Sequence, residues 1–186
     1  MFIGCTGLTK TTELPATTLV NYCYYGMFSI CTGLTQAPEL PATTLTDSCY
    51  LSMFNSCTSL TQAPELPATT LADSCYHSMF SGCTNLNYIK CLATDISATN
   101  CTSNWLVGVA ETGTFVKESG VNWTSGVNGI PEGWIVESGE TPTPDPETPV
   151  EPETPETPET PDDTKVYVKS SDCVSDVTVI NGKEYR

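Results

Sequence analysis

Residues 27–52 read MFSICTGLTQAPELPATTLTDSCYLS and residues 53–78 read MFNSCTSLTQAPELPATTLADSCYHS, so the two stretches differ at only five of 26 positions. Related units begin at Met1 and Met79, and four repeats therefore fill residues 1–26, 27–52, 53–78 and 79–104. A fixed period of about 20–50 residues is typical of a solenoid, in which each unit buries its apolar side against its neighbours. The pattern predicts an α/β solenoid of about four units, each with a short parallel strand and a short helical turn.

Apolar residues recur at equivalent places in the repeats and predict the core. Neighbouring units lie about 4.8 Å apart in such a stack, so each recurring residue becomes a continuous apolar column. A strand is expected near Leu34, ended by Pro38, and helix N-caps are expected at Asp47-Ser48 and Asp73-Ser74. Leu92 is aligned with the column of Leu14. The predicted core contains Leu8, Leu34, Leu60, Leu86, Leu14, Leu40, Leu66, Phe28, Phe54 and Phe80.

Eight of the ten cysteines form two further columns: Cys5, Cys31, Cys57 and Cys83, then Cys23, Cys49, Cys75 and Cys101. Zinc is disfavoured because neither short C-x-x-C steps nor histidines accompany them. Stacked cysteines lie within the Cα distance of a disulfide, but their parallel Cα–Cβ bonds keep the Cβ atoms further apart than a disulfide prefers. We expect free core thiols, with Cys31, Cys57, Cys49 and Cys75 in the core, and disulfides in an oxidising compartment as the alternative.

The amino-acid composition of the chain changes after residue 104. Residues 105–137 hold all three tryptophans and several β-prone stretches, which predict a C-terminal cap over the last repeat. Residues 138–164 alternate proline, threonine and acid, and predict a disordered, extended acidic linker. Residues 165–186 form a short β-type stretch around an Asn181-Gly182 hairpin signal, too small for its own core, so a truncated module is expected there.

Composition and the ends of the chain narrow the partners. With seven basic and 22 acidic residues the net charge is −15, which argues against nucleic-acid binding. No apolar run is long enough to span a bilayer. Met1-Phe2 already belongs to a repeat, so we expect either a cut through a longer array or an end on which further repeats or another chain stack.

The repeat pattern C-T-x-L-T-x-A-P-x-L-P-x-T-x-L-x-x-x-C-Y-x-x-M-F resembles the BspA-type leucine-rich repeats of bacterial surface proteins, and residues 113–136 are similar to the segment that closes such arrays. The resemblance covers residues 1–137, and the fourth repeat departs from it at residues 91–96. It implies a secreted or surface-attached protein of adhesion or host interaction. Similar repeats also occur in phage tail proteins.

Two sets of repeated side chains are candidate ligand-binding residues. Glu13, Glu39 and Glu65 predict a column of carboxylates, either a plain polar surface or a site bridged by a divalent cation or a basic partner. Tyr24, Tyr50 and Tyr76 predict an aromatic column, either a lining of the core or a glycan- or protein-binding stripe. Beside it lies a position that varies between copies: Tyr25, Leu51, His77.

No catalytic residue, metal ligand or cofactor site is predicted, because one histidine and a repeated sequence assemble no triad, metal set or phosphate loop. The expected function is non-enzymatic recognition of a protein or glycan on a host or neighbouring cell, by a protein at the cell surface or secreted. The alternative is a tail-fibre or receptor-binding component of a phage virion.

Overall fold

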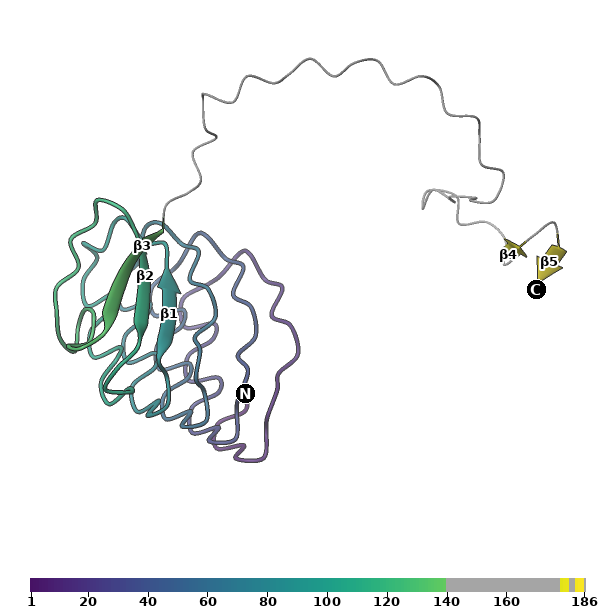
Figure 1. The fold of residues 1–186 in the computed structure, drawn as a ribbon, viewed down its shortest axis with the longest axis horizontal. Coiled ribbons are helices and arrows are strands. Elements are labelled where there is room, and N and C mark those ends of the chain that lie inside the picture. The colour runs from purple at the N-terminus through teal and green to yellow at the C-terminus, as the bar shows by residue number, and fades with distance from the viewer. Residues whose placement is uncertain (140–177, 181–182, 186) are drawn as a thin grey trace, which may run out of the picture. The chain divides into compact units, whose positions relative to one another are not determined.

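The computed structural model describes residues 1–139, 178–180 and 183–185, so residues 140–164 of the predicted linker lie outside the described residues, while its first two, Ser138 and Gly139, belong to a strand. The chain divides into two units, Met1–Thr143 and Pro144–Arg186. The first contains β1 (Tyr88–Cys91), β2 (Thr114–Glu118) and β3 (Ile135–Gly139), a parallel sheet in the order β1-β2-β3 (Figure 1). In the second, β4 (Thr178–Ile180) and β5 (Lys183–Tyr185) pair antiparallel on either side of Asn181-Gly182.

Successive repeats lie side by side and are joined through their backbones (Figure 1). The Tyr24 N–H donates to the Cys49 carbonyl at 2.9 Å, and the Tyr50 N–H donates to the Cys75 carbonyl at 3.1 Å. The same step recurs from Tyr76 to Cys101 at 2.9 Å. These bonds point N–H groups toward the C-terminal neighbour and carbonyl groups toward the N-terminal one, so the stack has a direction.

The segments predicted to be helical turns are runs of overlapping β-turns, and the described residues contain no helix, hence none long and apolar enough to cross a membrane. Ser48, Ser52 and Ser56 have φ values of 56°, 52° and 60°. Alternate N–H groups bond within the repeat to the carbonyl three residues earlier, and the others bond to the next repeat. An α-helix would use its N–H groups internally. The N-cap predictions at Asp47-Ser48 and Asp73-Ser74 are therefore wrong.

Prolines interrupt strand pairing in the second and third repeats. Their parallel pairing is limited to isolated bridges such as Lys10↔Gln36 and Gln62↔Tyr88. Pro38 and Pro64 lack the N–H that a ladder needs, whereas the fourth repeat has Lys90 at that place and forms β1. β1 pairs with β2 in the register Tyr88↔Thr114, so the 26-residue step continues into the cap.

The fourth repeat is one residue short at the position of Glu65, and the alignment of Leu92 with Leu14 is wrong. Leu66 pairs with Cys91 rather than Leu92, and Thr70 pairs with Asp95. Cys91, which belongs to neither cysteine column, thus takes the buried place of Leu66, with no exposed surface. Leu92 is half-buried instead.

The interior is built from the recurring columns. Buried predicted residues are Leu34, Leu60, Leu86, Leu40, Leu66, Phe28, Phe54, Phe80, Cys31, Cys57, Cys49 and Cys75. Leu8 and Leu14 of the first repeat are partly buried and pack against this core. The phenylalanine rings stack in parallel, with centroids 5.7 Å apart for Phe28–Phe54 and 5.6 Å apart for Phe54–Phe80.

The cap supplies acceptors for the donors of the fourth repeat. The Asn104 N–H donates to Asn128 Oδ1 at 2.8 Å, and Thr102 Oγ1 donates to the Asn128 carbonyl at 2.8 Å. Trp105, fully buried, donates through Nε1 to the Gly129 carbonyl at 2.8 Å. The cap thereby accepts one backbone N–H, that of Asn104, that a further repeat would accept, together with two side-chain donors.

Candidate binding face of the repeats

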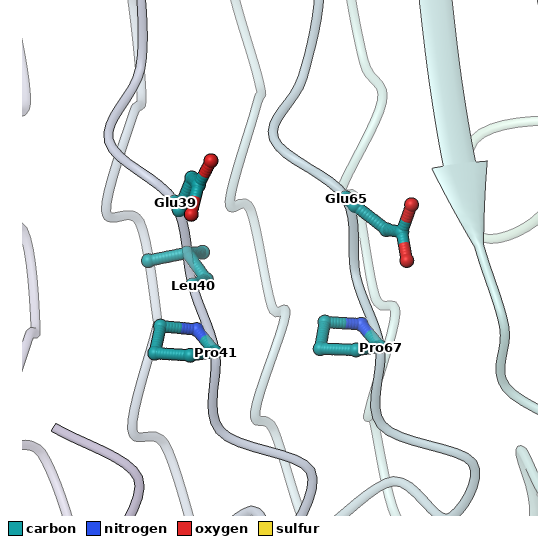
Figure 2. A pocket seen from close by; sticks show the side chains of 5 residues that line it. All are labelled: Glu39, Leu40, Pro41, Glu65 and Pro67. Atoms are coloured by element: carbon teal, nitrogen blue, oxygen red, sulfur yellow. The ribbon is translucent and has the colours of Figure 1, made fainter. Parts of the chain in front are cut away.

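The Glu-Leu-Pro segment of each central repeat presents polar residues around a buried anchor. Leu40 is 3 % exposed, while its neighbours Glu39 and Pro41 are exposed. The proline ring fixes φ and has no N–H, so this stretch stays extended without pairing continuously to its neighbour. The space left between repeats two and three is a hollow of about 400 Å³, lined by Glu39, Leu40, Pro41, Glu65 and Pro67 (Figure 2).

A second hollow, of about 240 Å³, lies one repeat earlier. Its lining residues are Lys10, Thr11, Thr12, Glu13, Gln36, Ala37, Pro38 and Glu39. Glu39 borders both hollows. The two hollows together are called the repeat groove below.

The predicted carboxylate column is interrupted by an ion pair. Glu65 Oε2 lies 2.8 Å from Lys90 Nζ, and Figure 2 shows the Glu65 carboxylate turned away from Glu39. The pairing raises the pKa of Lys90, chiefly through the hydrogen bond from its ammonium group to Glu65. Glu13 and Glu39 are exposed and make no ion pair with other described residues. The ion pair therefore neutralises Glu65, whereas Glu13 and Glu39 keep unpaired carboxylates in a groove that Lys10 also lines.

The tyrosine column lies inside the stack. Tyr50 and Tyr76 are each 1 % exposed, and Tyr24 is half-buried. Parallel rings follow one another from Tyr24 to Tyr50 at 5.7 Å and from Tyr50 to Tyr76 at 6.2 Å. Burial raises the pKa of the Tyr50 and Tyr76 hydroxyls. In this conformation Tyr50 and Tyr76 offer no surface to a ligand, so the binding-stripe interpretation does not apply to them.

The variable position beside the column is more accessible. Tyr25 is 50 % exposed and meets Tyr22 edge to face at 6.4 Å. His77 is half-buried, and its N–H bonds to the Ser74 carbonyl at 3.2 Å as part of the β-turn run. Tyr25 and His77 therefore remain candidate ligand contacts, on a face formed by the turns.

The nine cysteines of the described part carry free thiols, of which Cys5 and Cys23 are exposed. In the first column each buried thiol donates to a phenylalanine carbonyl of the preceding repeat: Cys57 Sγ to Phe28 O at 3.1 Å, and Cys83 Sγ to Phe54 O at 3.0 Å. Burial raises the pKa of Cys57 to about 12 and that of Cys49 to about 11. Such thiols stay protonated and act as small packing groups, since the thiolate is the nucleophile and metal ligand.

Two features of the surface were missed by sequence reasoning. One is the Lys90–Glu65 pair, which depends on the one-residue deletion in the fourth repeat. The other is a hollow of about 300 Å³ in the cap, bordered by Trp123, Trp134 and Pro131. The clustering of all three tryptophans in residues 105–137 was the available signal, and it was assigned to covering the core alone.

In the part of the chain that the structure describes, no group of three or more His, Cys, Asp or Glu side chains is placed to hold a metal ion. Comparison with family models, curated proteins and solved structures gives no match at any of the three levels. The leucine-rich repeat resemblance therefore stays a prediction.

Proposed function

We propose that the protein is a non-enzymatic recognition protein that binds a protein or glycan on another cell through its repeat surface, at the cell surface or outside the cell, as a leucine-rich repeat solenoid of the BspA type. The observation that carries the proposal is the repeat groove. Two hollows of about 400 and 240 Å³ lie between successive repeats and share Glu39. A surface that repeats in this way contacts an extended ligand at several equivalent points.

The distribution of chemistry supports recognition rather than catalysis. The thiols and phenols that recur in the repeats are mostly buried, and burial raises the pKa of Cys57 and Tyr50, which keeps them protonated at neutral pH. The exposed groups of the groove are the carboxylates of its glutamates, the ring of Pro41, the amide of Gln36, the hydroxyl of Thr12 and the ammonium group of Lys10. These groups fix and orient a ligand, and the unpaired carboxylates of Glu13 and Glu39 favour one with positive charge.

The test is binding of the full chain to arrays of basic, neutral and acidic peptides and of glycans. Glu39→Gln is the informative variant because Glu39 borders both hollows, and Glu137→Gln is the matched control because Glu137 is exposed on β3, outside the groove. We expect the array ligand to bind at least tenfold more weakly to Glu39→Gln and unchanged to Glu137→Gln. Equal binding by both variants would contradict a role for the groove.

A virion component is the second candidate, favoured by one observation. β3 forms an edge of its sheet with Ile135 65 % and Val136 46 % exposed, the kind of edge that a neighbouring subunit covers. In a tail fibre the chain assembles with copies of itself. Sedimentation equilibrium distinguishes the two: a stable trimer supports the virion component, and a monomer at micromolar concentration supports the surface protein.

A further inference from the structure

A continuous stack of rings runs through the repeats and ends in the cap. It passes from Tyr76 to Trp105, with centroids 6.2 Å apart and planes 15° apart. Trp105 then stacks on Trp123 at 5.4 Å and 11°. Among the described residues, Trp123 has no further parallel ring neighbour, so it is the last member of the stack.

The face of Trp123 turned away from Trp105 is not covered by the neighbouring phenylalanine. Phe115 meets both indoles edge to face, with its centroid 5.9 Å from Trp105 and 5.3 Å from Trp123. A ring beyond the far face of Trp123 would lie much further from Trp105 than from Trp123. Phe115 therefore lies beside the pair of indoles, and the end of the stack is left to other groups.

Trp123 also lines the cap hollow of about 300 Å³, near the lower limit of about 300–1,000 Å³ for small-molecule sites. Its walls include Trp123, Ile130 and Pro131, which are apolar. Its rim includes Asn122, Ser125 and Glu132, which are exposed and whose side chains make no hydrogen bond to other described residues. One apolar wall with several free polar groups suits a ligand that has one apolar face and many hydroxyls.

We propose that the cap hollow binds one pyranose ring of a glycan, stacked on the open face of Trp123. The C–H face of the sugar continues the ring stack, and its hydroxyls donate to Glu132 and exchange hydrogen bonds with Asn122 and Ser125. The site lies in the cap rather than the repeat groove, so it is independent of the function proposed above.

The observations favour a sugar over a proline-rich peptide. A proline ring would also stack on an indole, but it has no hydroxyl to pair with three polar groups gathered on one rim. The hollow is also small, which suits one ring rather than a run of residues. Lys117, which lines the hollow as well, donates to the Val121 carbonyl at 2.9 Å and to the Glu118 carbonyl at 3.4 Å, so two of its three ammonium donors are already used. The choice between a sugar and a proline-rich peptide therefore rests on the unpaired polar side chains of the rim, which are those of Asn122, Ser125 and Glu132.

The three indole N–H groups make the test specific. Trp105 and Trp134 donate to the Gly129 and Ala110 carbonyls, both at 2.8 Å, whereas the buried Trp123 Nε1 has no partner. The full chain labelled with ¹⁵N should show one indole signal distinct from the other two, assigned by Trp123→Phe. Titration with a panel of methyl glycosides of hexoses and N-acetylhexosamines should shift that signal with at least one sugar.

Two variants complete the experiment. The double variant Asn122→Ala/Glu132→Gln changes exposed residues and should retain the fold, seen in unchanged Trp105 and Trp134 signals, while binding the sugar at least tenfold more weakly. Glu39→Gln, in the repeat groove, should bind it normally. The proposal is overturned if no sugar moves the Trp123 signal, if a proline-rich peptide alone moves it, or if Glu39→Gln rather than the cap variant loses the sugar.

Discussion

Replacing Phe54 with alanine removes a ring from the middle of the phenylalanine column. Phe54 has no exposed surface and lies between Phe28 at 5.7 Å and Phe80 at 5.6 Å. Truncation of a buried phenylalanine costs about 3–5 kcal/mol, and each lost ring pair adds about 0.5–1.5 kcal/mol. We therefore expect Phe54→Ala to lower the free energy of unfolding by about 4–8 kcal/mol, a large part of the ~5–15 kcal/mol typical of a folded domain.

Phe2 supplies a matched control within the same column. It stacks on Phe28 at 5.6 Å but is 41 % exposed and has one ring neighbour. In a stack whose stability is a sum of neighbour contacts, a residue at the end loses one interface and less burial. Phe2→Ala is expected to cost about 1 kcal/mol. Phe54→Leu, which keeps an apolar side chain but loses both ring stacks, should fall between the two.

Urea unfolding followed by circular dichroism and by tryptophan fluorescence measures these differences. The tryptophans all lie in the cap, so coincident transitions by the two probes show that repeats and cap unfold together. Equal losses for Phe2→Ala and Phe54→Ala would refute the reasoning, because it would mean that position in the column carries no energetic weight.

Four further predictions concern thiols, the cap and the ion pair. The free energy of unfolding should fall as the pH rises above 9.0, the ordinary thiol pKa, toward the raised pKa values of about 11 for Cys49 and about 12 for Cys57, because in this range the thiols ionise only in the unfolded chain. The slope is at most about 1.4 kcal/mol per thiol per pH unit. Urea midpoints at pH 8, 9 and 10 measure it, and Cys57→Ala should reduce it. Iodoacetamide at pH 8 should label Cys5 and Cys23 but not Cys57 in the folded chain, as mass spectrometry would show, and equal rates would contradict the buried placement. Asn128→Ala should cost about 0.5–1.5 kcal/mol in a thermal melt by removing the acceptor of the Asn104 N–H, with Asn122→Ala as the silent control. Lys90→Met should leave the urea midpoint unchanged, since both partners of its ion pair are 39–50 % exposed, and a clear loss would mean that the pair matters more than exposed pairs do.

The inward-facing columns were readable from the sequence because burial repeats with the period. Leucine, phenylalanine and cysteine recur at fixed places, because a side chain that packs against the equivalent side chain of each neighbouring repeat is under the same packing constraint in every repeat. Leu60 and Cys57, for instance, have no exposed surface. The same logic failed at Leu92, because an alignment without gaps cannot reveal that the fourth repeat omits one residue and that Cys91 takes the place of Leu66.

The β-turn runs were mistaken for helical turns although the sequence held a signal. Positive φ values recur every four residues, at Ser48, Ser52 and Ser56, and at equivalent places the other repeats often have Gly, Ser or Asn. Gly and Asn adopt this region more readily than other residues. Tyr22 of the first repeat and Ile30 of the second obscured the pattern, because they stand at two of these places with φ values of 59° and 61°.

The direction of the backbone ladder explains why the cap is built as it is. Each repeat sends N–H donors toward its C-terminal neighbour, as Phe80 does to the Trp105 carbonyl at 3.0 Å, so whatever follows the fourth repeat must offer acceptors. Asn128 and Gly129 offer oxygens, and the Asn128 side chain takes one of the N–H groups, that of Asn104, that a further backbone would have taken. Satisfying that row with a short loop rather than a full repeat leaves the last indole, Trp123, without a ring on its outer face. The cap hollow is thus a direct consequence of ending a directional stack.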